Sequence, residues 1–132
     1  MIIVLDTSAA IEIVLGRKQA LFLGRKVAEA DWVISTALFI SEVTNVFWKY
    51  HQFADMPLAA CEKSIDDALA FPDEYFNENE LYKEAFAMAC LTKKPVYDMF
   101  FLALARRHNG YLMTLDLVLL ETARKNSIRI AE

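Results

Sequence analysis

The stretch Ile-Ile-Val-Leu-Asp-Thr-Ser at residues 2–8 decides the fold class. Its first four residues are apolar without a break, which is typical of a strand buried on both faces of a parallel sheet that lies under helices. Asp6 ends the apolar run, and Thr7 or Ser8 would cap the helix that follows. The N-terminus therefore predicts a central strand and a helix, with a carboxylate where the two meet.

Outward from this strand, predicted helices and strands alternate along the whole chain. Strands are expected at 32–35, 75–76, 111–114 and 128–130, and helices at 9–15, 18–30, 36–50, 57–71, 79–91, 98–108 and 117–125. Ser35 or Thr36 would cap the third helix, and His108-Asn109-Gly110 is a helix-ending signal. Such alternation implies right-handed crossovers. We predict an α/β three-layer fold in which helices flank a short parallel sheet of about four to five strands.

The size and composition bound the class of protein. A length of 132 residues fits one domain, so residues 1–132 are expected to form a single domain. Apolar residues make up 56% of the chain, which suggests that part of its surface is an interface. No segment has the roughly 18 apolar residues of a membrane span, and the N-terminus lacks the pattern of a signal peptide, so a cytoplasmic location is expected. Cys61 and Cys90 are expected to be buried and reduced.

The charge balance bears on possible partners. The chain has 18 acidic and 14 basic side chains, a net charge of -4, which argues against nucleic-acid binding because Lys and Arg supply most of that affinity. The argument weakens if the excess acids gather in one metal site. Adjacent basic residues could then contact a nucleic-acid backbone, or could be ordinary solvated surface: Arg17-Lys18, Arg25-Lys26, Lys93-Lys94 and Arg106-Arg107.

Four acidic residues stand in positions that ordinary surface solvation does not explain. Asp6 and Asp116 each follow a predicted strand, where open parallel sheets bind ligands. Glu42 lies within a helix and shares its face with apolar residues three and four positions away. Asp98 opens a helix whose following residues on the same face are apolar. Taken singly, each has a structural alternative: a helix cap for Asp6 and Asp116, a match to the helix dipole for Asp98, and a stem along the core edge for Glu42.

Together these four acids are expected to meet at one end of the sheet. Crowded carboxylates repel one another unless cations are present, and hard oxygen ligands suit Mg²⁺ or Mn²⁺. No cluster of His or Cys has the spacing of a zinc site, and His51 and His108 are isolated residues that we assign to the surface or to helix ends. The sequence therefore predicts a magnesium or manganese site.

Four stretches carry a resemblance to a known family, in matching order and over essentially the whole chain: IIVLDTSAAIEI, ISEVTNVFWK, YDMFFLALARRHNGYLMTLD and LETARKNSIRI. The sequence resembles the PIN domain, and specifically the VapC-type toxins of bacterial and archaeal toxin–antitoxin pairs. The match is loosest from Lys49 to Glu84.

The resemblance implies a PIN-like fold and a metal-dependent endoribonuclease. Asp6, Glu42, Asp98 and Asp116 would be the catalytic residues and metal ligands, with Thr7, Asn45 and Thr114 supporting the carboxylates by hydrogen bonds. It also implies a homodimer and a small antitoxin of VapB type, which lays an apolar segment on the toxin and blocks the site with a basic side chain. The products would carry 5′-phosphate and 3′-hydroxyl ends.

Three other functions compete with this one. A phosphatase of the haloacid dehalogenase type would need an Asp two residues after Asp6, where this chain has Ser8. A receiver domain would need an acid pair after the first strand and a Lys after the last, and neither is evident. The remaining alternative is a catalytically silent PIN-like scaffold that binds RNA or a protein.

Overall fold

The apolar run at the N-terminus forms strand β1 (Ile2–Leu5) at the centre of a five-stranded sheet in the computed structural model, which describes all residues 1–132. Ile3, Val4 and Leu5 have no exposed surface, because the strand is covered on both faces. β1 pairs in parallel with β2 (Trp32–Thr36) on one side and with β4 (Tyr111–Met113) on the other.

The sheet has the strand order β3-β2-β1-β4-β5, and all its pairs are parallel. β3 (Glu74–Phe76) and β5 (Arg129–Ile130) are the two edge strands. The chain winds outward from β1 to β3 and then continues on the other side of β1 with β4 and β5. The winding direction thus reverses between β1 and β4, and a crevice is expected at the carboxyl ends of these two strands.

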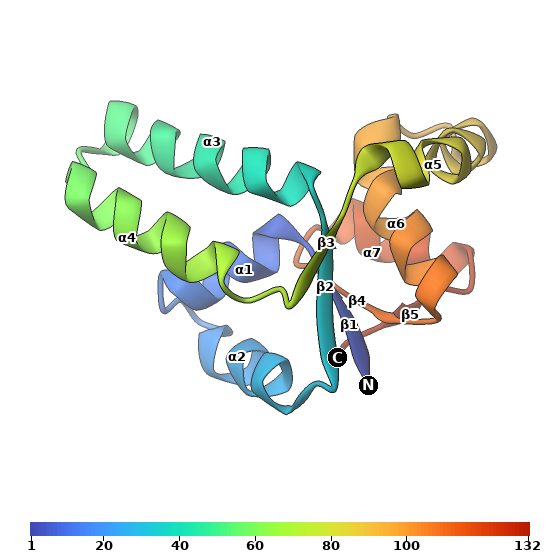
Figure 1. The fold of residues 1–132 in the computed structure, drawn as a ribbon, viewed down its shortest axis with the longest axis horizontal. Coiled ribbons are helices and arrows are strands. Elements are labelled where there is room, and N and C mark those ends of the chain that lie inside the picture. Colours follow the sequence, from blue (N-terminus) through green and yellow to red (C-terminus); the bar gives the residue numbers. More distant parts are fainter.

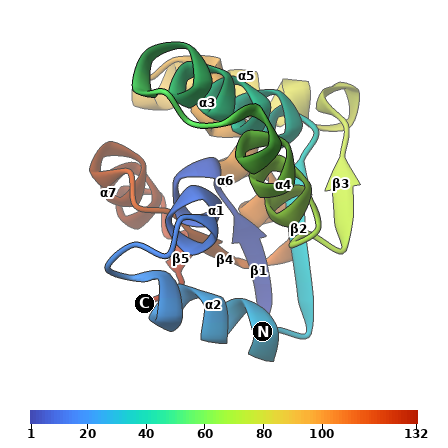
Figure 2. The same ribbon diagram turned by 90° about the vertical axis from the view of Figure 1, so that its left-hand side faces the viewer.

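Helices lie on both sides of the sheet (Figure 1). On one side are α1 (Thr7–Val14), α2 (Ala20–Glu29), α3 (Leu38–Ala54) and α4 (Leu58–Leu69), which are in front in Figure 2. On the other side are α5 (Glu78–Thr92), α6 (Val96–His108) and α7 (Leu117–Lys125). The predicted α/β three-layer fold with a short parallel sheet is confirmed. None of the helices combines the length and apolar composition that crossing a bilayer requires.

Helix α6 is the most deeply buried helix and packs directly on the sheet. Its residues Met99–Ala105 are all buried, because the helix packs on β1, β2 and β4 and is covered by α5. The helix ends at Asn109, whose φ of 51° takes the left-handed conformation that Gly often supplies. Gly110 serves a different need: a Cβ atom there would lie 3.3 Å from a side-chain carbon of Ile2 and 3.4 Å from its carbonyl oxygen. The absence of a side chain lets β4 begin close against β1.

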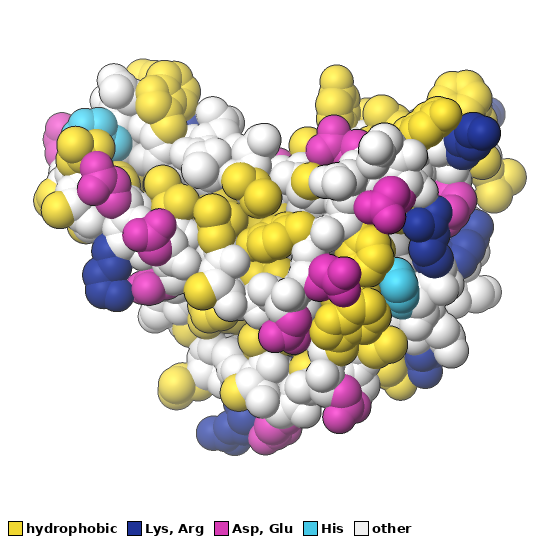
Figure 3. All heavy atoms as spheres, in the orientation of Figure 1, with side chains coloured by type: hydrophobic (Ala, Val, Ile, Leu, Met, Phe, Trp, Pro, Cys, Tyr) yellow, Lys and Arg dark blue, Asp and Glu magenta, His cyan; other side chains and the backbone are white.

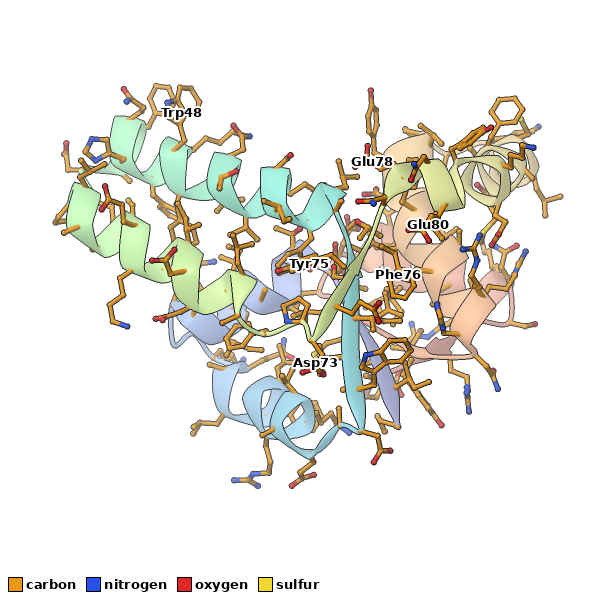
Figure 4. The ribbon with its side chains drawn as sticks, in the orientation of Figure 1. Trp48, Asp73, Tyr75, Phe76, Glu78 and Glu80 are labelled. Atoms are coloured by element: carbon orange, nitrogen blue, oxygen red, sulfur yellow. The ribbon has the colours of Figure 1, made fainter.

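The strand predicted at Tyr75 and Phe76 is borne out by β3. The two side chains point to opposite sides of the sheet (Figure 4). Tyr75 donates a hydrogen bond to the carbonyl oxygen of Leu69 at 2.7 Å, whereas Phe76 lies against His108 on the α6 side. His108 is the last residue of α6, at a helix end as predicted, but its ring is half-buried in an aromatic cluster with Trp32 and Phe76.

Several local predictions were wrong because hydroxyl side chains found other partners. Thr7 and Ser8 lie inside α1 and do not cap it. Ser35 and Thr36 belong to β2, and Ser35 donates to the carbonyl oxygen of Leu5 at 2.7 Å, so α3 starts without a side-chain cap. Two further predictions differ from the structure for other reasons. Helix α3 continues to Ala54, past the predicted end at residue 50. Cys61 is buried as predicted, whereas Cys90 is exposed.

Candidate active site

A hollow of about 280 Å³, which we call the acidic pocket, lies at the carboxyl ends of β1 and β4, where the winding of the sheet reverses. Its lining contains all four acids singled out in the sequence and neither Lys, Arg nor His: Asp6, Thr7, Ser8, Glu42, Asn45, Val46, Asp98 and Asp116. The surface view shows the molecule hollowed between the arm formed by α3 and α4 and the end of α5 (Figure 3). The four acids come from four separate elements, so the fold alone brings them together.

Asp6 is fixed by contacts between the ends of β1 and β4. Its backbone N–H donates to the carbonyl oxygen of Met113 at 3.0 Å, which extends the strand pairing by one residue. Its Oδ2 accepts hydrogen bonds from Thr114 Oγ1 at 2.5 Å and Ser8 Oγ at 2.8 Å. Both hydroxyls accept backbone N–H groups in turn, from Asp116 at 3.1 Å and Leu115 at 2.9 Å. The carboxylate of Asp6, which is 7% exposed, is therefore held in one orientation.

Glu42 reaches the pocket from α3. Its Oε1 accepts a hydrogen bond from Thr7 Oγ1 at 2.7 Å, and this contact ties the start of α1 to α3. The helical spacing puts Glu42 on the same face as Val46, another residue of the lining. Asn45 also lines the pocket, and no hydrogen bond joins its side chain to a carboxylate.

Asp98 and Asp116 enter from the starts of α6 and α7. Asp116 is the N-cap of α7, and its Oδ1 accepts from the backbone N–H groups of Val118 at 2.9 Å and Leu119 at 3.2 Å. Asp116 is thus a helix cap, the alternative that the sequence also allowed, but capping occupies only one of its two carboxylate oxygens. Asp98 lies in the first turn of α6 and is half-buried.

The four charges interact with one another. Burial raises the pKa of Asp6, and the charge of Asp116 adds to the rise, while the hydrogen bonds from Thr114 and Ser8 oppose it. Burial and the charges of Asp6 and Asp116 raise the pKa of Asp98. Burial, with the charges of Asp6 and Asp98, raises the pKa of Glu42 from 4.5 to about 7 in spite of the hydrogen bond from Thr7. Like charges have thus been gathered where no side-chain cation offsets them.

The donor set fits a hard divalent cation. All the charged ligands in the lining are carboxylates, which Mg²⁺ and Mn²⁺ prefer. Glu42 and Asp116 each keep one oxygen without an internal donor. No three His, Cys, Asp or Glu side chains have the spacing of a preformed metal site.

The raised pKa of Glu42 gives a pH dependence of stability that can be measured. A carboxyl group with a higher pKa in the folded state favours folding below its unfolded pKa, and that advantage is lost as the pH rises toward the folded value. In EDTA, the free energy of unfolding should fall between about pH 4.5 and pH 7. In Glu42→Gln the free energy of unfolding should fall by about 1–2 kcal/mol less over this pH range than in the wild-type protein, a figure that allows for solvent screening. Urea unfolding at both pH values measures the free energy of unfolding, and Glu62→Gln, a change at an exposed acid, is the control. If the free energy falls as much in Glu42→Gln as in the wild-type protein, the Glu42 charge is not buried as described.

Ser8 is the pocket residue whose role the sequence did not predict. Its hydroxyl donates to Asp6 and accepts from the backbone of Leu115. The available signal was its place in the polar run that directly follows β1, but a Ser at the start of a helix usually reads as a cap. Thr7 and Thr114, expected to support carboxylates, donate to Glu42 and Asp6 respectively.

Comparison with known proteins agrees with this architecture. The profile of the PIN domain family matches residues 3–125. Ribonuclease VapC3 of Pyrobaculum aerophilum is 28% identical over 123 residues, an alignment that covers 92% of this chain and 94% of that protein. The family match extends from β1 through α7 and includes every residue of the acidic pocket. The chain therefore belongs to the PIN domain family.

Proposed function

We propose that this protein is a metal-dependent endoribonuclease that hydrolyses RNA phosphodiester bonds, and that it is the toxin of a VapBC-type toxin–antitoxin pair. The observation that carries the proposal is the pocket at the strand ends, which four carboxylates line without a side-chain cation. Membership of the PIN domain family and the similarity to a protein named as a ribonuclease support the nuclease assignment. On this proposal residues 1–132 act as one nuclease domain.

The four acids are assigned to holding Mg²⁺ or Mn²⁺. Asp6 is the best oriented of them, because Ser8 and Thr114 fix its Oδ2. Thr7 orients Glu42 in the same way. When bound, a divalent cation supplies a Lewis acid for the scissile phosphate and lowers the pKa of a water molecule. Without a cation, four carboxylates would repel a phosphodiester, so metal binding is also a condition for binding the substrate.

Attack by water distinguishes this proposal from ribonucleases that use the RNA 2′-hydroxyl. That chemistry relies on a pair of positioned acid–base groups, and the pocket has no histidine. The products of hydrolysis are expected to carry 5′-phosphate and 3′-hydroxyl ends. Labelling the fragments with a kinase before and after phosphatase treatment identifies the 5′ end.

The first test is RNA cleavage by the purified protein. Cleavage should require Mg²⁺ or Mn²⁺, stop on addition of EDTA and resume when the metal is restored in excess. The alternative, a catalytically silent scaffold, predicts RNA or partner binding that is indifferent to metal and no cleavage under any condition. Retention of all four acids in one pocket favours the enzyme.

The toxin role implies a protein partner and a cytoplasmic location, where RNA and antitoxin are both present. An antitoxin of VapB type would lay an apolar segment on the surface and place a basic side chain against the carboxylates, which attract one. Expression of this protein alone should arrest growth, and co-expression with the product of a short neighbouring reading frame should relieve the arrest. Growth that is unaffected by the active protein would contradict the toxin role and leave the nuclease standing.

A homodimer is the second proposed assembly, and exposed apolar side chains on α5 and α6 support it. Tyr82 and Phe86 share one face of α5 and are 51% and 65% exposed, and Tyr97 on α6 is 64% exposed. Phe86→Arg should weaken dimerisation by at least about 2 kcal/mol, because a charge replaces an aromatic anchor. Light scattering after size exclusion measures the mass, with exposed Leu21→Arg on α2 as the control. Equal masses for all three proteins would move the interface elsewhere or exclude it.

A further inference from the structure

We propose that Arg17, Lys49 and Tyr50 form a binding track for the single-stranded RNA next to the scissile phosphate, an inference that rests on the proposed ribonuclease function. Arg17 and Lys49 would bind backbone phosphates, and the ring of Tyr50 would stack on a base. The family match is loosest from Lys49 to Glu84, the segment that begins with Lys49 and Tyr50.

The track begins in a hollow that adjoins the acidic pocket. A cavity of about 480 Å³ is lined by Ile11, Glu12, Arg17, Tyr50 and Leu115, and by three residues that also line the acidic pocket: Thr7, Ser8 and Val46. A third hollow of about 320 Å³ follows, lined by Val46, Lys49, Tyr50 and Ala54. Val46 lines all three hollows, and Tyr50 lines the second and the third, so the three hollows adjoin one another along α3.

Helix α3 forms one wall of all three hollows. Glu42, Val46 and Tyr50 follow one another at intervals of four residues and lie on one helix face, with Asn45 and Lys49 beside them. From Glu42 to Tyr50 the helix rises about 12 Å. The sequence of this face therefore changes from anionic at the pocket to cationic and aromatic at its far end.

Arg17 supplies a positive charge close to the carboxylates. It is the only cationic side chain in the lining of the second cavity, and it lies in the turn after α1. Its backbone N–H donates to Glu12 at 3.1 Å and its carbonyl oxygen accepts from Ala20 at 3.0 Å, so the backbone under it is fixed. The carboxylate of Glu12 accepts from the backbone N–H of Gln19 at 3.0 Å.

The side chains of Arg17 and Tyr50 are already paired. The guanidinium donates to the phenolic oxygen of Tyr50, and its central carbon lies 5.8 Å from the ring centroid. The ring of Phe47, which is buried three residues earlier on α3, lies 5.9 Å from that of Tyr50 and braces it. A cation over a phosphate path and a braced aromatic ring are the two elements that proteins combine to bind single-stranded nucleic acid.

A second Arg–Tyr pair provides a matched control. Arg129 lies 4.3 Å from the ring centroid of Tyr111 and donates to its phenolic oxygen at 3.2 Å. Both residues are at the amino ends of their strands, β5 and β4, the opposite end of the sheet from the acidic pocket. The two pairs thus share their chemistry and differ in position.

The test measures RNA binding separately from cleavage. Asp98→Asn, which keeps the other three carboxylates, serves as the background that binds RNA without cleaving it at saturating Mg²⁺. Fluorescence anisotropy of a labelled unstructured oligoribonucleotide gives the Kd over a range of salt. Adding Arg17→Ala should raise the Kd about tenfold and reduce the slope of log K against log salt by about 0.7. Adding Tyr50→Ala should raise the Kd roughly 5- to 150-fold, and Tyr50→Phe should recover affinity relative to Tyr50→Ala. Adding Arg129→Ala should change neither quantity.

The outcomes separate this inference from the proposed function. If the wild-type protein cleaves RNA, but adding Arg17→Ala or Tyr50→Ala leaves the RNA affinity of the Asp98→Asn background unchanged, the track is wrong and the ribonuclease stands. If the wild-type protein does not cleave RNA in metal, the proposed function itself has failed. If Arg17→Ala abolishes inhibition by a co-expressed antitoxin while RNA affinity is unchanged, the groove belongs to a protein partner and the RNA track is overturned.

Discussion

Asp6→Asn is expected to lower metal-dependent RNA cleavage by at least about 1000-fold while the fold is retained. The substitution keeps the size of the side chain and an oxygen that can accept from Ser8 and Thr114, so the contacts between β1 and β4 survive. It removes the negative charge of the most buried acid in the pocket. Initial rates on a fluorescent RNA substrate in Mg²⁺ and in Mn²⁺ measure the loss, and circular dichroism checks the fold.

The control for Asp6→Asn is the same change at Asp66, an exposed acid on α4 that does not line the acidic pocket. Asp66→Asn should cleave at the wild-type rate. A third variant, Asp116→Asn, separates capping from catalysis, because Asn caps helices about as well as Asp. It should keep the stability of the wild-type protein and lose activity. Residual cleavage in Asp6→Asn that resists EDTA would trace the activity to another site or to a contaminant.

The fold class could be predicted because short stretches of the sequence already indicate which segments are buried and which form helices or strands. The apolar run before Asp6 predicted a strand covered on both faces, and the alternation of helices with strands predicted a parallel sheet. The burial of β1 and the parallel pairing of all five strands agree with these predictions. The strand order itself could not be predicted, since the chain carries no local signal for which strand β1 pairs with. The complete burial of Met99–Ala105 is also a tertiary effect: α6 is enclosed by the sheet and α5.

The four acids that line the pocket could be predicted because each carboxylate stands next to apolar residues in the sequence. Their convergence then followed from one rule about parallel sheets, which bind ligands at the carboxyl ends of their strands. What failed was the assignment of small hydroxyl side chains. Ser8 and Ser35 read as caps in the sequence, but tertiary partners, Asp6 and the carbonyl oxygen of Leu5, compete successfully for them. A hydroxyl has several possible partners, and only the fold decides among them.

Asp98→Asn is expected to reduce cleavage by at least about 100-fold and, without metal, to make the protein more stable. Burial and the charges of Asp6 and Asp116 raise the pKa of Asp98 and are the causes of that shift, so the charged form is disfavoured in the folded protein. The position of Asp98 in the first turn of α6 opposes this, since the helix dipole favours an anion by about 0.3–1 kcal/mol. The net effect of neutralising Asp98 in EDTA at pH 7 should be a rise in Tm of a few degrees.

Metal should reverse this order, and the reversal distinguishes an active-site acid from a structural one. Mg²⁺ or Mn²⁺ at 100 times its Kd would stabilise the wild-type protein by about 2.7 kcal/mol, whereas Asp98→Asn has lost a ligand and should gain much less. Asp73 provides the contrast, because its carboxylate accepts from the backbone N–H of Val33 at 2.8 Å, outside the acidic pocket. Asp73→Ala should lower the Tm with and without metal. Thermal unfolding of the three proteins in EDTA and in metal decides the matter: if Asp98→Asn melts below the wild-type protein in EDTA, Asp98 stabilises the fold and is not a charge held in place for a cation.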